Sequence, residues 1–453
     1  MNGIRSLTLS LLFALPVAAQ TAQQPDSLAG MNLKRVSLQE ALQLAARQGP
    51  DVAAARAQAA IAHAQVDRAW TAWQPDAVVN GQYDHTNGVA AVDFRPLLAP
   101  LGLPLNAFGP QPLTIVAQNN WNGFAQISQP LFTPQGAFGI GAAKSGAEAA
   151  DRGADQAREQ ILLSVARAYL ALQGFEGLLQ AARDAEKVAL RREDDAKARI
   201  NAGTDVEIGL LRAQSETAGA RVQIANIVGQ QQNLLPLLEA LTGDNIAPVP
   251  FGQAPGLPMP ADSGKEPWED SFSVKSALAQ VSAQGQAKRV AEFGWLPSVS
   301  AVAKESYTSN EGFVGKNWTY DLMINASLPV WDRGVRLAQL HEDDAKLQQA
   351  QANLASARAR AKADWVGSKA NLIAAQAVLD QTISQEQVAT RAQVQVEASA
   401  RAGVATSLDL SDADQRKFAA QSAAAQARTA LEVRKAEIAA SVGRLYSLTT
   451  GPN

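Results

Sequence analysis

The sequence contains an internal repeat, and this duplication limits its possible folds more than any other feature. Four short anchors recur in the same order in both halves, about 200 residues apart in three cases and 222 apart in the fourth. Halves that share a pattern at a near-fixed offset are expected to share one structure. The paired anchors are Trp73-Gln74-Pro75 with Trp295-Leu296-Pro297, Gln129-Pro130-Leu131-Phe132 with Leu328-Pro329-Val330-Trp331, Ala202-Gly203-Thr204 with Ala402-Gly403-Val404, and Leu241-Thr242-Gly243 with Ser441-Val442-Gly443.

The anchors divide the chain into a first repeat at 36–243 and a second at 268–446. Each repeat is predicted to contain a helix, two strands, a very long helix, a tip turn and a returning helix. The first helix should run unbroken from a capping box at Ser37 and Glu40 to about Trp73. The remaining predicted elements are strands at about 76–88, 121–131, 298–309 and 317–329, long helices at 136–201 and 334–401, tip turns at 201–206 and 401–407, and returning helices at 206–242 and 407–446. Between the repeats, the proline-rich residues 244–267 predict an irregular linker, and residues 447–453 a C-terminal tail.

Residues 1–19 have the pattern of a secretory signal peptide. Arg5 precedes an apolar core, Pro16 ends that core, and small residues follow. After this segment no stretch approaches the roughly 20 apolar residues that a membrane-spanning helix needs. If the exported protein crosses a membrane, it must therefore do so with strands.

Composition excludes several classes of function. A net charge of −3 gives no electrostatic basis for nucleic-acid binding. The chain has no cysteine, and His63, His85 and His341 lack metal-ligand spacing. Neither a phosphate-binding glycine loop nor a nucleophile elbow is present. The sequence therefore predicts no cofactor, no metal and no enzymatic activity.

Alternating polarity marks the predicted strands. From Trp318 to Leu328, every second residue is apolar, and aromatic residues gather at one end of that face. A strand with lipid on one face and water behind it has this pattern, and so does a half-buried hairpin of a soluble protein. Trp121, Trp318 and Tyr320 are expected to form a membrane-interface belt, with core aromatics of a soluble sheet as the alternative.

Four strands per chain cannot close on themselves, and open sheet edges are not tolerated in hydrocarbon. Spanning strands would therefore require an oligomer. The two very long helices point the same way, because their Ala-rich seams are spaced for packing against other helices.

These residues resemble the TolC-like outer membrane efflux family over about 36–446. The resemblance rests on the Ser37-Leu38-Gln39-Glu40-Ala41-Leu42 opening and on the duplicated anchors. It implies an α+β membrane protein: a homotrimer with a 12-stranded outer membrane β-barrel, four strands per chain, continued by a long α-helical barrel in the periplasm. The implied partners are outer membrane lipid, a periplasmic adaptor and an inner-membrane pump, and the implied function is that of a passive exit duct. The alternative is a soluble periplasmic coiled-coil adaptor or structural protein.

In this family the tip turns dock the adaptor and the tunnel narrows beside them. The corresponding positions here are Gly203, Thr204, Asp205, Gly403, Val404, Ala405 and Thr406. The spacing of Asp409 and Asp412 after Gly403 is similar to the family's acidic constriction, which would favour cations. Asp residues that stabilise a helix N-terminus would have the same spacing. Ala405 and Gly209 stand where some members carry charged residues. A closed state held by ion pairs between chains would therefore depend on Asp205, Glu207 or Arg212 instead.

The long first-half connection at 89–120 is apolar for an extracellular loop. We expect it to fold over the barrel mouth or to pack against its copies, with Phe94, Leu98, Leu101 and Phe108 narrowing the outer exit. The sequence does not identify the transported substrate, because a wide aqueous duct passes whatever its pump delivers.

Overall fold

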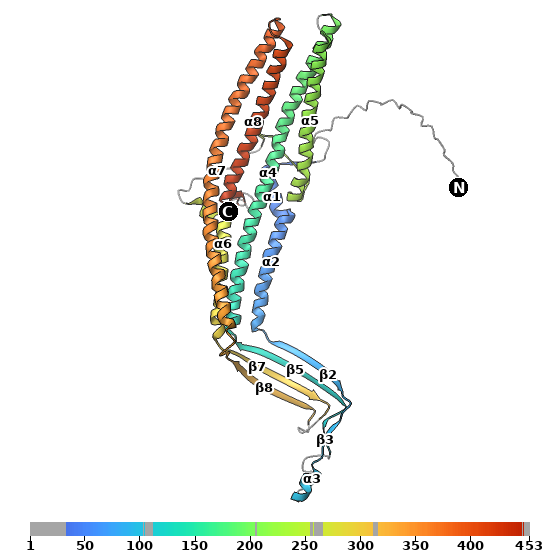
Figure 1. Ribbon diagram of the computed structural model, residues 1–453, viewed down its shortest axis with the longest axis vertical. Coiled ribbons are helices and arrows are strands. Elements are labelled where there is room, and N and C mark those ends of the chain that lie inside the picture. The colour runs from blue at the N-terminus through green and yellow to red at the C-terminus, as the bar shows by residue number, and fades with distance from the viewer. Residues whose placement is uncertain are drawn as a thin grey trace, which may run out of the picture.

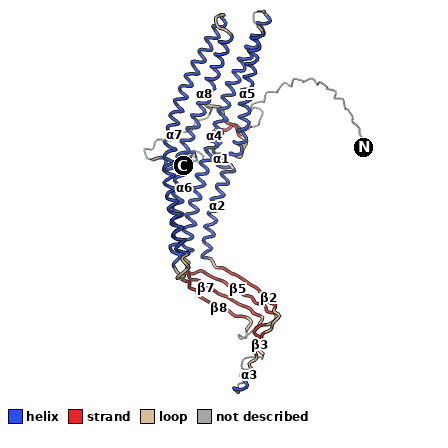
Figure 2. Tube along the Cα trace, viewed as in Figure 1, coloured by secondary structure: helices blue, strands red, loops and turns tan. Residues whose placement is uncertain are grey.

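The computed structural model describes residues 33–102, 104, 112–203, 206–253, 257, 266–310, 316–445 and 447. The molecule is elongated, with helices along most of its length and a layer of strands at one end (Figure 1, Figure 2). The predicted signal peptide at 1–19 lies outside the described residues, as does the tail after residue 447. Among the described helices, none combines the length and the apolar composition that crossing a membrane requires.

The predicted strands form one antiparallel sheet that joins the two repeats. Its order is β2 (Asp76–His85), β5 (Asn119–Phe132), β7 (Ser298–Thr308) and β8 (Trp318–Ser327). Because β5 pairs with β7, the centre of the sheet is the seam between the halves. Within the described chain, β2 and β8 are edge strands. Both end earlier than the sequence predicted, at residues 85 and 327 instead of 88 and 329.

Two very long helices extend from the sheet to the tips. α4 (Pro134–Asn201) has 68 residues and α7 (Val335–Arg401) has 67, each about 100 Å at the rise of an α-helix. Their returning partners are α5 (Glu207–Thr242) and α8 (Ser407–Ser441). Gly203 and Gly403 adopt positive φ angles of 67° and 79° at the turns, a conformation that ends helices and favours glycine.

The first repeat opens with two helices, so the prediction of one unbroken helix to about Trp73 is wrong. α1 (Leu38–Gln48) begins at the predicted capping box of Ser37 and Glu40, and α2 (Pro50–Trp70) follows after Gly49. A residue before proline avoids the helical region, and proline has no N–H to continue the ladder. The helix therefore stops at Gly49, whose ψ is 124°, and restarts at Pro50.

Part of the predicted irregular linker is ordered, which corrects the prediction for 244–267. Ile246–Pro248 forms β6, which pairs in parallel with β1 (Lys34–Val36). The Tyr169 hydroxyl on α4 donates to the Val36 carbonyl oxygen at 2.8 Å and accepts from the Val249 N–H at 3.2 Å. Burial raises the pKa of Tyr169 to about 12. This tyrosine lies in the largest apolar core, where the N-terminal segment and the start of the linker meet α4.

Shorter helices meet end to end along the flanks of α4. α5 ends at Gly243, where an added Cβ would lie 3.0 Å from the Gln48 carbonyl oxygen at the end of α1. α8 ends near Gly443, where an added Cβ would lie 2.8 Å from the Phe272 ring at the start of α6 (Phe272–Glu292). α2 and α6 pack on α4 near the sheet, and α5 and α8 pack on it towards the tips (Figure 1). The wall is therefore four helices wide along its length.

A close contact between α4 and α8 gives a test of this packing. A Cβ at Gly174 of α4 would lie 2.3 Å from Thr429 Oγ1 of α8, whereas a Cβ at Gly177 would lie 3.8 Å from the Ala425 side chain. We expect Gly174→Ala to lower the free energy of unfolding by about 1–3 kcal/mol, because threonine is stiff and cannot move aside cheaply. The matched variant Gly177→Ala should be neutral or slightly stabilising. Thermal unfolding followed by circular dichroism measures both.

Adding Thr429→Ala to Gly174→Ala should restore most of the loss, because it removes the side chain that the new methyl group meets. A double variant as unstable as Gly174→Ala alone would show that this contact does not limit helix packing.

Candidate functional site: the two-faced sheet and the helix tips

The register of the sheet separates apolar from polar side chains. Directly paired residues of antiparallel strands lie on the same face, so a face can be followed across all four strands. One face is mostly apolar, and Leu322 and Ile324 on it are each 75% exposed. This apolar face consists of Ala77, Val79, Gly81, Tyr83, Trp121, Gly123, Ala125, Ile127, Val299, Ala301, Ala303, Tyr307, Trp318, Tyr320, Leu322, Ile324 and Ala326, with His85, Asn119, Gln129 and Glu305 as its polar members.

The opposite face is mostly polar. Lys304 lies directly across from Asp321 on the neighbouring strand, and its ammonium group lies 4.7 Å from the centre of the Phe124 ring. Val78, Phe124, Pro130, Val302 and Met323 are the apolar residues among the paired positions of this face. Its polar members are Asp76, Asn80, Gln82, Asp84, Asn120, Asn122, Gln126, Ser128, Ser298, Ser300, Lys304, Ser306, Thr308, Thr319, Asp321, Asn325 and Ser327.

Aromatic residues gather on the apolar face at the end of the sheet that is remote from the helices. Trp121 packs against Tyr83 with ring centres 4.8 Å apart, and Trp318 packs against Tyr307 at 5.0 Å. Tyr320 is 79% exposed on the same face. The structure thus brings Trp121, Trp318 and Tyr320 to one end of one face. Sequence reasoning missed Tyr83 and Tyr307, although the strand alternation alone assigns both to this face.

The segment between β2 and β5 extends beyond this end of the sheet (Figure 1). It contains the paired strands β3 (Ala90–Val92) and β4 (Leu113–Val116), the short helix α3 (Arg95–Leu98) and a 3-10 turn at Ala99–Leu101. Leu101 is 65% exposed, and Phe94 immediately precedes α3. Phe108 and the side chain of Leu98 lie outside the described part of the chain.

At the second tip, Asp409 closes a capping box with Thr406. The Thr406 N–H and hydroxyl donate to Asp409 Oδ2 at 2.9 and 2.7 Å, and the Asp409 N–H donates to the Thr406 hydroxyl at 3.2 Å. These hydrogen bonds hold the pKa of the Asp409 carboxyl below its usual value. In the single chain Asp409 therefore stabilises the N-terminus of α8, which is the alternative to a constriction that the sequence left open.

The other tip residues remain solvent-exposed or pair locally. Asp412 forms an ion pair with Arg416 at 2.7 Å, one turn along α8. Val404 is 81% exposed between Gly403 and the half-buried Ala405. Gly203 lies at the other tip, whereas Thr204 and Asp205 are outside the described residues. The structure brings Gly403, Val404, Ala405, Thr406 and Asp409 together at one tip.

A charged cluster below the tips joins the two hairpins, and sequence reasoning missed it. Arg192 of α4 pairs with Asp414 of α8 and donates to the Leu410 carbonyl oxygen at 3.0 Å. Ser411 of α8 donates to Glu216 of α5, whose carboxylate lies 4.0 Å from Arg192. Burial lowers the pKa of Arg192 against the opposing effect of nearby carboxylates. The cluster borders a recess of about 620 Å³ between α4, α5 and α8.

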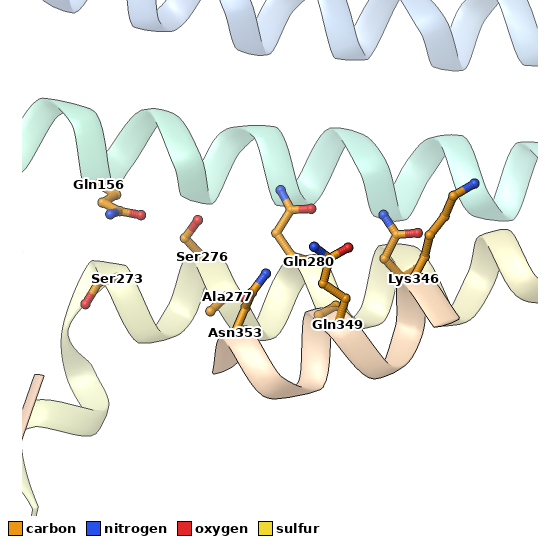
Figure 3. A pocket seen from close by; sticks show the side chains of 10 residues that line it. Gln156, Ser273, Ser276, Ala277, Gln280, Lys346, Gln349 and Asn353 are labelled. Atoms are coloured by element: carbon orange, nitrogen blue, oxygen red, sulfur yellow. The ribbon is translucent and has the colours of Figure 1, made fainter. Parts of the chain in front are cut away.

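A second recess lies nearer the sheet, where α4, α6 and α7 meet (Figure 3). It encloses about 320 Å³, and amide and hydroxyl groups from all three helices line it. Gln156 extends from α4, Ser276 and Gln280 from α6, and Gln349 and Asn353 from α7. The contact between α4, α6 and α7 is therefore partly polar, unlike the apolar core where α4 meets α1 and the end of α5.

Comparisons with known proteins agree with these features. A family model described as outer membrane efflux protein matches residues 41–244 and 268–444, which are nearly the two repeats. The chain therefore belongs to the outer membrane efflux protein family, and the resemblance in its sequence is confirmed. Comparison with curated protein sequences finds no match.

Solved structures share the fold at low sequence identity. The CmeC outer membrane channel of Campylobacter jejuni superposes with a TM-score of 0.73 at 16% identity, over 90% of this chain and 86% of that chain. The outer membrane protein VceC of Vibrio cholerae gives 0.70 at 18%, over 90% and 96%. The MtrE outer membrane channel of Neisseria gonorrhoeae, in its open state, gives 0.70 at 17%, over 90% and 88%.

Proposed function

We propose that three copies of this chain close a 12-stranded β-barrel in the outer membrane, continued by a helical duct through the periplasm. The duct is a passive exit for substrates delivered by an inner-membrane pump through a periplasmic adaptor. One observation carries the proposal: a sheet with two open edges has one apolar and one polar face. In a closed barrel the apolar face meets lipid and the polar face lines a water-filled pore.

The direction of the edge strands supports closure by identical copies. β2 runs away from the helices and β8 runs back towards them. Placing β8 of one copy beside β2 of the next therefore continues the antiparallel order without interruption. Closure pairs the backbone groups of both edges, which hydrocarbon would otherwise leave without partners.

Exposed apolar residues on the helices support the same assembly. α7 carries Val366, Ile373 and Val388, which are 55–64% exposed in the single chain. On α5, Ile208, Leu211 and Val222 are 56–65% exposed. Burying such residues against neighbouring copies would remove apolar surface from water.

The tips are the proposed site of adaptor docking and of the periplasmic constriction. Docking is assigned to Gly203, Thr204, Asp205, Gly403, Val404, Ala405 and Thr406, and the constriction to Asp409 and Asp412. Three-fold symmetry would bring three copies of each acid towards the axis. Their mutual repulsion would act against the hydrogen bonds that lower the pKa of Asp409 in the single chain.

The proposal predicts where the protein is found and what it conducts. Full-length chain expressed with its natural N-terminus should fractionate with outer membranes. In gels it should migrate as a larger species before heating than after, because heat separates the three copies. Purified protein should form ion-conducting channels in planar lipid bilayers. Recovery in the periplasmic extract, with no channel activity, would instead support the soluble adaptor alternative.

Neutralising the tip acids should change ion selectivity. We expect Asp412→Asn to lower the cation preference of the channel, because it removes three carboxylates from the narrowest part of the duct. Reversal potentials under a salt gradient measure this. Asp364→Asn, which changes one charge of the same sign on α7 far from the tip, is the matched control. If both substitutions changed the selectivity equally, Asp412 would not be part of the constriction.

Asp409→Asn should affect selectivity and helix order together, because Asp409 also closes the capping box. Thr406 remains the N-cap, and the amide oxygen of the asparagine can still accept from the Thr406 N–H, so α8 should remain folded. A change of selectivity in this variant with unchanged protection of α8 amides would assign Asp409 to the constriction.

The segment between β2 and β5 is proposed to narrow the outer exit through Phe94, Leu98, Leu101 and Phe108. Replacing residues 89–116 by a short glycine-serine turn should raise single-channel conductance, because apolar side chains at the pore mouth exclude water and ions. Shortening the β7–β8 turn, which carries no comparable apolar run, is the control. Unchanged conductance after removal of 89–116 would exclude a gating role for this segment.

A further inference from the structure

The residues between β8 and α7 form the most exposed apolar segment at the junction of sheet and helices. Val330 and Trp331 are 79% and 78% exposed, and Leu328 is 57% exposed. The corresponding residues of the first repeat, Leu131 and Phe132, belong to β5 and are 51% and 45% exposed. The apolar segment is therefore outside the sheet in the second repeat, whereas the equivalent residues of the first repeat belong to a strand.

The backbone after this segment is held in an uncommon conformation. Arg333 has a φ of 63° and Gly334 a φ of 81°, and the Val335 N–H donates to the Asp332 carbonyl oxygen at 3.3 Å. Two successive left-handed residues with this hydrogen bond form a type I′ turn. Among the described residues, Arg333 is the only one other than glycine with a positive φ. Such conformations cost free energy and persist where surrounding contacts enforce them.

Two residues enforce the turn. The Asp332 carboxylate accepts from the Arg336 backbone N–H at 3.1 Å and pairs with the Arg336 side chain at 3.2 Å. Arg336 also donates to the Pro329 carbonyl oxygen at 3.2 Å, and its guanidinium carbon lies 5.3 Å from the centre of the Trp295 ring. These contacts fix the turn while Trp331 and Arg333 remain exposed.

The exposed segment continues the apolar face of the sheet. Residues 318, 320, 322, 324 and 326 alternate on that face, and 328 and 330 keep the same spacing beyond the last paired residue. Val330 is ten positions after Tyr320 on this face. At about 3.3 Å per residue and a tilt of about 40°, this spans roughly 25 Å along the membrane normal, the height of the apolar band of an outer membrane barrel.

We propose that Leu328–Arg333 anchors each chain in the periplasmic leaflet of the outer membrane. Val330 and Trp331 enter the boundary between phospholipid headgroups and acyl chains, and Arg333 meets the lipid phosphates. The inference rests on the proposed membrane-spanning sheet and adds a residue-level contact with phospholipid at its helical end. Charge complementarity supports phospholipid as the occupant, because Arg333 has no ion-pair partner among the described residues.

The absence of cysteine makes single-cysteine labelling a direct test. Nitroxide labels at Val330→Cys, Leu322→Cys and Gln385→Cys are compared in phospholipid vesicles, using collisions with oxygen and with a water-soluble nickel chelate. The label at 322 should be in hydrocarbon, the label at 385 on α7 in water, and the label at 330 at an intermediate, interfacial depth. Trp331→Ala should shift the label at 330 towards water, whereas the matched Phe132→Ala should not.

The outcomes separate the anchor from the proposed function. A label at 330 as water-exposed as that at 385, with 322 in hydrocarbon, would overturn the anchor and leave the spanning sheet intact. A label at 330 as deep as that at 322 would overturn the interfacial placement. A water-exposed label at 322 would overturn the spanning sheet and the anchor together.

Arg333→Gly tests the phosphate contact, because glycine accepts the left-handed turn and removes only the charged side chain. Partitioning from detergent micelles into vesicles that contain phosphatidylglycerol, relative to phosphatidylcholine alone, should fall by at least about five-fold. One basic side chain near an anionic lipid surface contributes about 1 kcal/mol, which corresponds to that factor. If the ratio of partitioning into the two kinds of vesicle were unchanged, Arg333 would not contact the lipid phosphates.

Discussion

Backbone hydrogen bonding at the edges of the sheet is the constraint on which the rest of the structure depends. β2 and β8 each present a row of unpaired N–H and C=O groups along ten residues. Water can satisfy these groups, but hydrocarbon cannot. The apolar face of the same sheet favours transfer of the sheet from water into hydrocarbon. Such a transfer is possible only when the backbone groups of both edge strands are paired. In the proposed assembly, copies of the same chain would supply that pairing, because the two edges run in opposite directions.

The same fourfold division continues into the helical wall. Each chain contributes four strands at one end and a wall four helices wide along its length. α4 and α7 span that length without interruption, whereas α5 ends at the junction of α1 and α2, and α8 ends at the start of α6. Glycines at these junctions and at the α4–α8 contact let helices approach without side chains between them. The wall can therefore follow the circumference that the strands set.

Much of this fold could be predicted from the sequence because its signals are periodic. Strand alternation identified the apolar face, and the absence of proline identified α4 and α7. The break at Gly49 was missed although Pro50 signals it locally, and the capping box at Ser37 gave no information about how far the helix extends. β6 could not be predicted, because its partner β1 lies over 200 residues away in sequence and neither strand is longer than three residues.

Residues of the candidate site could be predicted only where a periodic pattern, such as strand alternation, fixes the face on which a side chain lies. Trp121, Trp318 and Tyr320 lie on one face because alternation and register require it. Arg192, Glu216 and Asp414 appear in the sequence as ordinary charges on helix surfaces. Their association depends on how α4, α5 and α8 are oriented about their axes, and the local sequence pattern of each helix does not specify that orientation. Asp409 shows the converse difficulty, because one spacing satisfies both a capping box and a constriction.

The duplication itself explains why equivalent positions have diverged. In the first repeat the second strand is central, so β5 stays paired with β7 as far as Phe132. In the second repeat the equivalent strand is the edge β8, and its pairing within the chain ends at Ser327. The released residues Leu328–Trp331 no longer have a sheet partner in their own chain, so their side chains are free to take a contact outside it. A duplicated sequence folded into an open sheet thus has one copy of each strand at the centre and one at an edge. New surface contacts can arise at the edge copy without disturbing the seam between the halves.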